Sequence, residues 1–349
     1  MEIRKLSQEE HNKVRPLYEE VFTEDSKGFV DYYFSEKTRD NDIYVVEEDG
    51  EICAMLHLNP YTLMVNGVEK QAHYIVAVAT RKAYRGRGFM AALLRRALQD
   101  MYASGENFTF LMPVAEAIYT PHDFRTVYEQ ERRVYNLADA VKKEAAGICI
   151  RPLTEEDCDT LAEWANEKLA ADKDVYVKRD GSYYLRLMRE CDSDGGKLML
   201  FQNETGIEDC RIWFPDEDED ETPKIMTRIV DVRRMLMSLR LQELLCVCFT
   251  VTDSAIEENN RTLVLTGTEI SGAMLMDGKP ENSEGEIPIA ALTSFVFGAK
   301  TVEELCEEDG VHMTERMKEE MKKIIQANYP LERFELPREE AIAKMKALN

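Results

Sequence analysis

The chain has 349 residues, which is too many for one ordinary domain, so we expect two or three. Its formal net charge of −23 argues against nucleic acid as a partner, because phosphate binding requires a basic surface. The acidity either attracts cationic small molecules or serves solubility alone. The sequence has no run of 18 apolar residues and no signal peptide, so we expect no membrane contact and a cytoplasmic location.

The eight cysteines lack the spacing of a metal site. No Cys-x-x-Cys pair occurs, and Cys246 and Cys248 have neither a second pair nor a histidine tract beside them. We therefore expect reduced thiols and no bound metal, as is usual in the cytoplasm.

The chain opens with a short strand and a capped helix. Ser7 and Glu10 have the spacing of a capping box, in which each side chain satisfies a backbone N–H of the other residue. The helix that follows has one apolar face, made of Val14, Leu17, Tyr18, Val21 and Phe22.

Two β-hairpins are expected next, because turn dipeptides, Asp49-Gly50 and Asn66-Gly67, interrupt alternating apolar segments. Before them, the aromatic-rich residues 23–40 are expected to set the width of a substrate pocket. The four predicted strands are residues 42–47, 51–58, 61–65 and 68–78.

The most informative segment follows these hairpins. The apolar residues 76–80 lead into a basic turn, Arg85-Gly-Arg-Gly88, and the turn opens onto an amphipathic helix over residues 89–102. Glycine allows close approach of a ligand and positive φ, and the first N–H groups of a helix have no partner inside it. The turn therefore suits a diphosphate, to which its two arginines add positive charge.

This turn is neither a Walker A motif, since it lacks Lys-Ser/Thr, nor a G-x-G-x-x-G dinucleotide motif. It resembles the acetyl-CoA signature of the GCN5-related N-acetyltransferases, the GNAT family, which reads Arg/Gln-x-x-Gly-x-Gly/Ala. The resemblance implies that acetyl-CoA is the co-substrate. The residues that it implies for binding acetyl-CoA are Val76, Ala77, Val78, Arg85, Gly86, Arg87, Gly88, Phe89 and Met90.

The start of the chain is repeated near its middle. Residues 3–10 recur as residues 150–157, each with a short strand, a capping box and then a helix. This similarity predicts a duplicated domain. The second copy has no basic glycine pair, so we expect it to be degenerate and unable to hold the cofactor.

A third region begins near residue 225. We expect a helix over residues 227–237, and residues 287–298 favour a strand that enters a helix ending at glycine. Further helices are expected over residues 314–327 and 338–348. Between the helix predicted over residues 227–237 and residues 287–298, strands are predicted over residues 244–252, 261–266 and 273–276.

Taken together, the chain resembles acetyltransferases of the enhanced intracellular survival (Eis) type. The residues that carry this resemblance are the basic turn, the segments 113–119 and 226–232, and the later segment 290–298. It implies a mixed α+β protein with tandem GNAT domains, over residues 1–136 and 148–224, and a sterol-carrier-like α/β domain over residues 225–349. It also implies a homo-oligomer, since the resembled family forms rings of six. After Tyr119 the chain departs from the family pattern, with Pro-His-Asp in place of its aromatic and glycine residues.

Acetyl transfer to an amine requires a polarised thioester carbonyl, a neutral amine and a proton for the leaving thiolate. The resemblance implies a bulge in the strand that holds Val76 to Val78, which would free backbone N–H groups to polarise the carbonyl. Tyr119 follows the strand predicted over residues 108–112, where the family has its general acid, and its ordinary pKa of about 10 is close to that of a thiol.

The base and the acceptor site are less defined by the sequence. The resemblance implies the terminal carboxylate of Asn349 as the base, with His73 and His122 as alternatives because a neutral imidazole suits the task. Candidate residues for substrate binding are Phe34, His73 and Glu116.

We therefore expect an acetyl-CoA-dependent N-acetyltransferase that acts on a primary amine of a cationic small molecule, such as an aminoglycoside, a polyamine or a lysine-like group. The alternative is a non-catalytic protein that senses acetyl-CoA or holds an apolar ligand in its third region.

Overall fold

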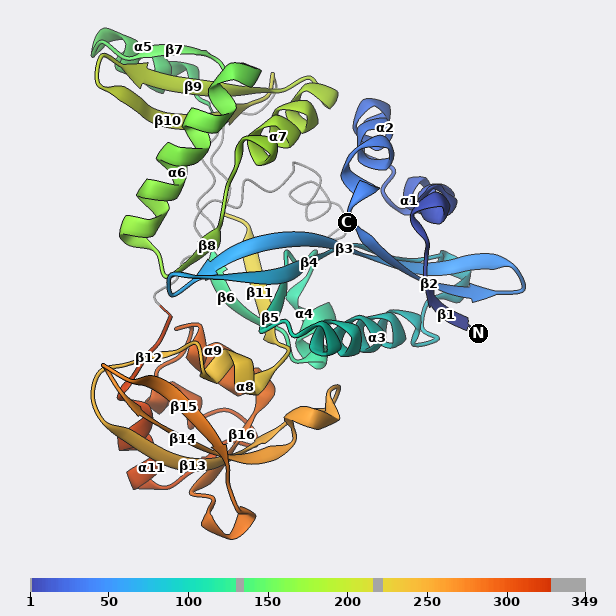
Figure 1. Ribbon diagram of the computed structural model, residues 1–349. Helices are drawn as coiled ribbons and strands as arrows, with labels where there is room; N and C mark the ends of the chain where they lie inside the picture. The colour runs from blue at the N-terminus through green and yellow to red at the C-terminus, as the bar shows by residue number, and fades with distance from the viewer. Residues whose placement is uncertain (1, 130–134, 216–221, 328–349) are drawn as a thin grey trace.

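A computed structural model describes residues 2–129, 135–215 and 222–327 (Figure 1). Its largest sheet has the strand order β1-β2-β3-β4-β5-β11-β6, with β8 paired to the far end of β3. No helix in the described residues is long and apolar enough to cross a bilayer. The strands of this sheet are β1 (Glu2–Lys5), β2 (Asp42–Glu48), β3 (Glu51–Val65), β4 (Val68–Thr80), β5 (Phe108–Leu111), β6 (Arg125–Glu129), β8 (Val175–Val177) and β11 (Lys224–Ile229).

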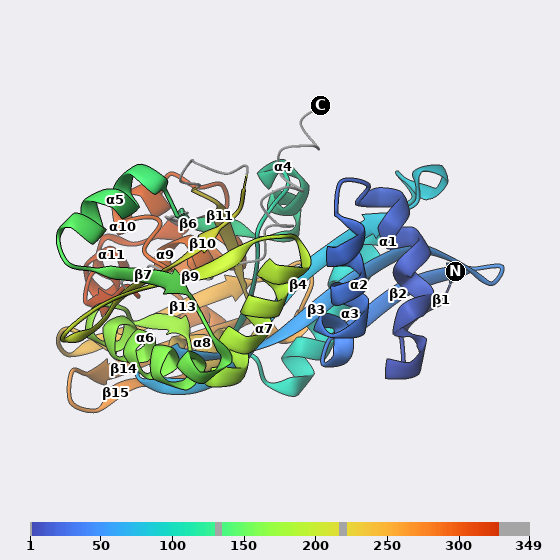
Figure 2. The same ribbon diagram turned by 90° about the horizontal axis from the view of Figure 1, so that it is seen from above.

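Helices cover both faces of the large sheet. Helices α1 (Arg15–Val21) and α2 (Lys27–Ser35) lie on one face, and α3 (Phe89–Ser104) lies on the other (Figures 1 and 2). The apolar face predicted for α3 is the face that the structure buries, and the helix ends at Gly105 with a φ of 85°. The cores on the two faces hold the central strands from both sides.

A second, smaller sheet follows, with the order β10-β9-β7. Both predicted capping boxes are present, and in each the acidic residue also pairs with an arginine of the preceding strand: Arg4 with Glu10 at 3.0 Å, and Arg151 with Asp157 at 2.6 Å. The two starts thus share one local structure. The elements of this region are β7 (Cys149–Pro152), β9 (Lys197–Asn203), β10 (Gly206–Trp213), α5 (Leu137–Ala145), α6 (Cys158–Asp172) and α7 (Gly181–Ser193).

The third region contains a five-stranded sheet of order β15-β14-β13-β16-β17, and β12 pairs separately with β18. The predicted strands are present, and so is the strand that enters a helix ending at Gly298, whose φ is 71°. The strands are β12 (Arg240–Leu241), β13 (Leu245–Thr252), β14 (Arg261–Thr268), β15 (Gly272–Asp277), β16 (Gly285–Pro288), β17 (His312–Met313) and β18 (Ile324–Ile325). The helices are α8 (Val232–Leu236), α9 (Ile289–Val296), α10 (Val302–Leu305) and α11 (Glu315–Met321).

The helix predicted over residues 227–237 is wrong. Residues 224–229 form β11, which lies between β5 and β6, and only residues 232–236 are helical. Strand β11 is buried from Ile225 to Ile229 but includes Thr227 and Arg228, so it lacks the regular alternation of apolar and polar residues that would mark it as a strand. The large sheet is therefore completed by a strand from the third predicted region.

Three other elements predicted from the sequence also need comment. The strands predicted over 51–58 and 61–65 are one strand, β3, because Pro60 lies beyond the end of β2, which pairs only as far as Leu58. The helix predicted over 314–327 is shorter, since α11 ends at Met321 and β18 follows it. The helix predicted over 338–348 lies outside the described residues.

A buried ion pair joins the large sheet to the third region. Arg228 of β11 and Asp253, just after β13, have side chains with no exposed area, and their charged groups lie 2.5 Å apart. Asp253 also accepts hydrogen bonds from the backbone N–H of Ala255 and from the side chain of Asn259. The two charges satisfy each other where no water reaches them.

The Asp253→Asn variant tests this connection. Removing the carboxylate of Asp253 leaves the buried Arg228 with only the more distant carboxylate of Asp123, 3.5 Å away, so we expect the free energy of unfolding to fall by about 3 to 5 kcal/mol in urea titrations. The matched control is Arg233→Met, whose partner Asp277 is 78% exposed and whose loss should cost less than about 1 kcal/mol. Equal losses in the two variants would contradict the account.

Candidate active site

Strand β4 contains a bulge at the residues predicted to bind acetyl-CoA. Val76 pairs with His57 and Ala79 with Met55, so Ala77 and Val78 together face one residue of β3. Ala77 has a φ of 49°, a left-handed conformation that is uncommon for a residue other than glycine. The bulge that the family resemblance implied is present, and it turns backbone groups of β4 away from the ladder.

On its other edge, β4 separates from β5 at the same point. The two parallel strands are in register only at Tyr74 with Phe110 and Ile75 with Leu111. From Val76 to the end of β4, the ladder in the described residues gives this edge no partner from β5. Backbone N–H and C=O groups at this opening are therefore available to a ligand that lies along β4.

The basic turn is built as the sequence predicted. Gly86 and Gly88 have φ values of 77° and 79°, and Gly88 directly precedes the 16-residue helix α3. A side chain at either position would be strained by the backbone, although neither lacks space for a Cβ. The unpaired N–H groups at the start of α3 and the open turn together fit a diphosphate.

The two arginines of the turn differ in their surroundings. The Nε of Arg85 donates to the carbonyl of Thr80 at 3.2 Å. Arg87 pairs with Glu48 at 2.9 Å and its guanidinium lies over the ring of Phe89. Arg87 is therefore partly neutralised, and an incoming phosphate would compete with Glu48 for it.

Tyr119 lies in the core cluster that also contains Phe89, Phe124 and, at its margin, Val78. It ends the short helix α4 (Glu116–Tyr119), which follows β5, and it is 7% exposed. Burial raises the pKa of its hydroxyl to about 12, and within the described residues that hydroxyl makes no hydrogen bond. Tyr119 is thus a protonated donor with no hydrogen bond within the described residues, in the same apolar cluster as Phe89 at the start of α3.

Arg228 holds the segment that follows Tyr119. Its Nε donates to the carbonyl of His122 at 3.1 Å, and its guanidinium lies 3.5 Å from the carboxylate of Asp123. Because Arg228 is itself fixed by Asp253, the third region anchors the tyrosine segment. The local sequence around Arg228 predicts no role for it, because its partners His122 and Asp253 are distant in the chain.

The other candidate residues are held in contacts of their own. The Nδ1 of His73 is 2.7 Å from Glu106, and Glu116 pairs with Lys224 at 2.9 Å. Phe34 is buried in the core between α1 and α2, where its ring meets that of Tyr18 edge-on. Burial lowers the pKa of His122. The substrate-binding roles of Phe34, His73 and Glu116 stay predictions that these contacts do not favour, and Asn349 lies outside the described residues.

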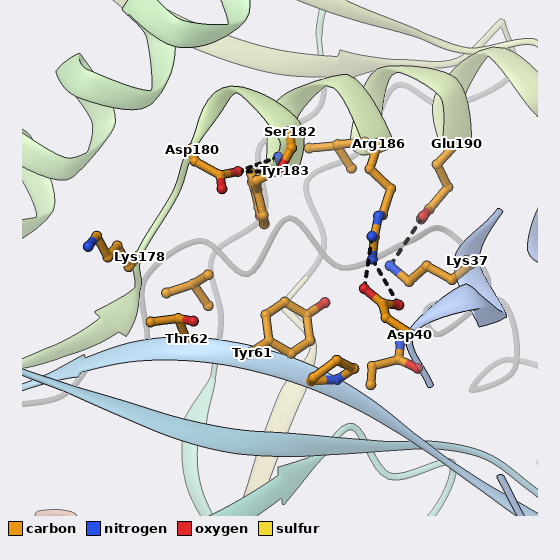
Figure 3. Close-up of a pocket in the computed structure, with 14 residues that line it drawn as sticks. Lys37, Asp40, Tyr61, Thr62, Lys178, Asp180, Ser182, Tyr183, Arg186 and Glu190 are labelled. Atoms are coloured by element: carbon orange, nitrogen blue, oxygen red, sulfur yellow. Dashed lines mark hydrogen bonds and ion pairs between the residues drawn. The ribbon is translucent and has the colours of Figure 1, made fainter. Parts of the chain in front are cut away.

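A cavity of about 190 Å³ lies between β3 and helix α7 of the second region (Figure 3). Its lining includes Asn59 of β3, which pairs with Tyr74 of β4, three residues before the bulge at Ala77. Lys37 and Asp40 belong to residues 23–40, which the sequence predicted to set the width of a substrate pocket. The α7 residues, among them Arg186 and Glu190, were missed, because only the tertiary fold brings them to β3.

Within the described residues, no group of three or more His, Cys, Asp or Glu side chains is placed to hold a metal ion. All eight cysteines are free thiols, and Cys246 and Cys248 are no exception.

Comparisons with known proteins assign this part of the fold. Residues 2–127 match the family described as acetyltransferase (GNAT) domain. No curated protein sequence matches the chain. Solved structures with 12 to 16% sequence identity share the fold over nearly the whole chain.

Three of these structures illustrate the likeness. A probable N-acyltransferase of unknown function from Enterococcus faecalis has 14% identity and a TM-score of 0.73, covering 93% of this chain and 97% of its own. A GCN5-related N-acetyltransferase from Anabaena variabilis has 16% identity and a TM-score of 0.71, covering 94% and 98%. Eis1 from Mycobacterium abscessus has 14% identity and a TM-score of 0.68, covering 96% and 100%.

Replacing Gly88 with leucine tests the turn. A bulky side chain at the mouth of α3 should weaken acetyl-CoA binding at least tenfold in calorimetric titrations, because it blocks close approach of the diphosphate to the backbone. The matched control is Gly67→Leu, in the β3–β4 hairpin, where φ is 80° and space is equally open, so both variants carry about 1 to 2 kcal/mol of backbone strain. Equal affinity in both variants would remove the turn from the binding site.

Proposed function

We propose that this enzyme transfers the acetyl group of acetyl-CoA to a primary amine of a small molecule by direct attack. The premise is that residues 2–127 form a GNAT acetyltransferase domain whose donor is acetyl-CoA. The observation that carries the proposal is the opening of β4 at its bulge, with the glycine turn at one end and Tyr119 beside it. We assign acetyl-CoA binding to the predicted residues of β4, the turn and the start of α3.

The chemistry follows from these positions. N–H groups freed at the bulge would donate to the thioester carbonyl and stabilise the negative charge that grows on its oxygen. The amine nitrogen attacks the carbonyl carbon, the carbon–sulfur bond breaks, and the thiolate takes a proton from the hydroxyl of Tyr119. The attacking amine loses one proton, and for that step we retain the terminal carboxylate of Asn349 as the proposed base.

The acceptor classes that we propose are aminoglycosides, polyamines and lysine-like amines. The net charge of −23 supports them, because a negative field speeds the approach of cations. The cavity between β3 and α7 is the proposed acceptor site, since its lining residue Asn59 pairs with Tyr74, two residues before Val76 on β4.

The wider assignments belong to the same proposal. We propose that residues 148–224 are a degenerate second GNAT-like domain, which the shared capping boxes support, and that residues 225–349 form a sterol-carrier-like domain. We further propose an Eis-type enzyme that forms homo-oligomers and works in the cytoplasm. The placement of β11 within the first sheet means that the first and third domains would fold as one unit.

The Tyr119→Phe variant tests the mechanism. Loss of the proton donor should lower kcat by about 10² to 10⁴, with the Kd of acetyl-CoA changed less than twofold, measured as thiol release with a panel of primary amines. Because burial raises the pKa of Tyr119 to about 12, the hydroxyl stays protonated at ordinary pH, and kcat should not fall between pH 8 and 10.5 through this group. Unchanged turnover in the variant would remove Tyr119 from the reaction.

A further inference from the structure

The cavity between β3 and α7 has a lining whose formal charges cancel, although the chain as a whole is strongly acidic. A polyamine or an aminoglycoside carries several positive charges and no negative one. A site for such a ligand requires an excess of acidic groups, since like charges brought together oppose binding. The lining instead matches a ligand that carries both signs. Its charged residues are Lys37, Lys178, Arg186, Asp40, Asp180 and Glu190.

Two buried oxygens of the lining have no hydrogen-bond donor within the described residues. They are Oδ1 of Asn59 and Oε1 of Glu190, on residues that are 3% and 5% exposed. The other oxygen of Glu190 accepts from the hydroxyl of Tyr32 at 3.2 Å and lies 3.4 Å from the ammonium of Lys37. Buried acceptors are rarely left without a donor, and the N–H groups of an amine would supply one to each.

Arg186 lies one turn before Glu190 on α7 and points into the same cavity (Figure 3). Its two terminal nitrogens donate to the two oxygens of Asp40 at 3.2 and 2.9 Å. Its Nε makes no hydrogen bond within the part of the chain that the structure describes, and its side chain is 41% exposed. Arg186 can therefore bind a carboxylate while it keeps its contact with Asp40.

Building on the proposed function, we propose that the acceptor is an amino-acid-like molecule that carries a carboxylate as well as its amine. Arg186 binds the carboxylate, and the free oxygens of Asn59 and Glu190 accept N–H groups of the amine. The cavity volume of about 190 Å³ fits this class, because sites for drug-sized ligands measure roughly 300 to 1,000 Å³. Among the proposed acceptor classes, the structure thus selects the lysine-like one.

The test compares amines with and without a carboxylate. L-lysine with cadaverine, and L-leucine with 3-methylbutylamine, are pairs in which only the carboxylate differs. We expect kcat/KM to be at least tenfold higher for the amino acid of a pair, because the decarboxylated amine offers no acceptor to the Nε of Arg186. Arg186→Gln should lower kcat/KM about tenfold for the amino acids and change it less than twofold for the decarboxylated amines.

The matched control is Arg189→Gln. Arg189 also lies on α7, is similarly exposed and pairs with Glu36 of the first region at 2.9 Å, but it does not line the cavity. For this variant, we expect kcat/KM to equal the wild-type value for both compounds of each pair. An equal effect of the two substitutions would show a structural role in joining the regions and would overturn the assignment of Arg186.

The outcomes separate this inference from the proposed function. Acetylation of the decarboxylated amines as fast as, or faster than, the amino acids would overturn the inference and leave the acetyltransferase function in place. If no amine releases thiol from acetyl-CoA, the proposed function fails. Calorimetry with L-lysine and the CoA-loaded protein then decides the inference, which requires binding that Arg186→Gln weakens and Arg189→Gln does not.

Discussion

The architecture depends on one constraint, which is that β4 bulges against β3 at the place where its pairing with β5 ends. The bulge at Ala77 interrupts its pairing with β3, and the parallel ladder to β5 ends at Ile75. A left-handed alanine costs about 1 to 3 kcal/mol, and it persists because packing on both faces fixes the strand. Ala77 and Ala79 belong to the core under α1 and α2, while Ile75 belongs to the core under α3. The stability of both cores therefore maintains an opening that neither core needs.

The parts that complete the site come from all three regions of the chain. The first region supplies β4, the glycine turn and Tyr119. The third supplies β11 and, through Asp253, the position of Arg228, which holds the segment after Tyr119. The second supplies one wall of the cavity through α7. No single region carries both the proposed donor site and the cavity.

The sequence predicted the features that local physical chemistry determines. The hairpins, both capping boxes, helix α3 and the glycine turn depend on residues close together in the chain, and the structure confirms them. Strand β11 was predicted as a helix, because its burial comes from two distant strands and two cores rather than from its own pattern. The place of Arg186 and Glu190 in the cavity could not be predicted for the same reason, since these side chains line it only when α7 packs against β3. Asn349 and the predicted final helix lie outside the described residues, so they remain predictions.

The most direct test of the account is amide hydrogen exchange, with and without CoA, followed by mass spectrometry of peptides. The account predicts that CoA slows exchange mainly over residues 76–80 and 85–90, where N–H groups of the open strand, the turn and the start of α3 would gain partners. Peptides from the β3–β4 hairpin, around Asn66-Gly67, should be unchanged. Protection elsewhere, with these two segments unaffected by bound CoA, would contradict the claim that the opening of β4 is the donor site.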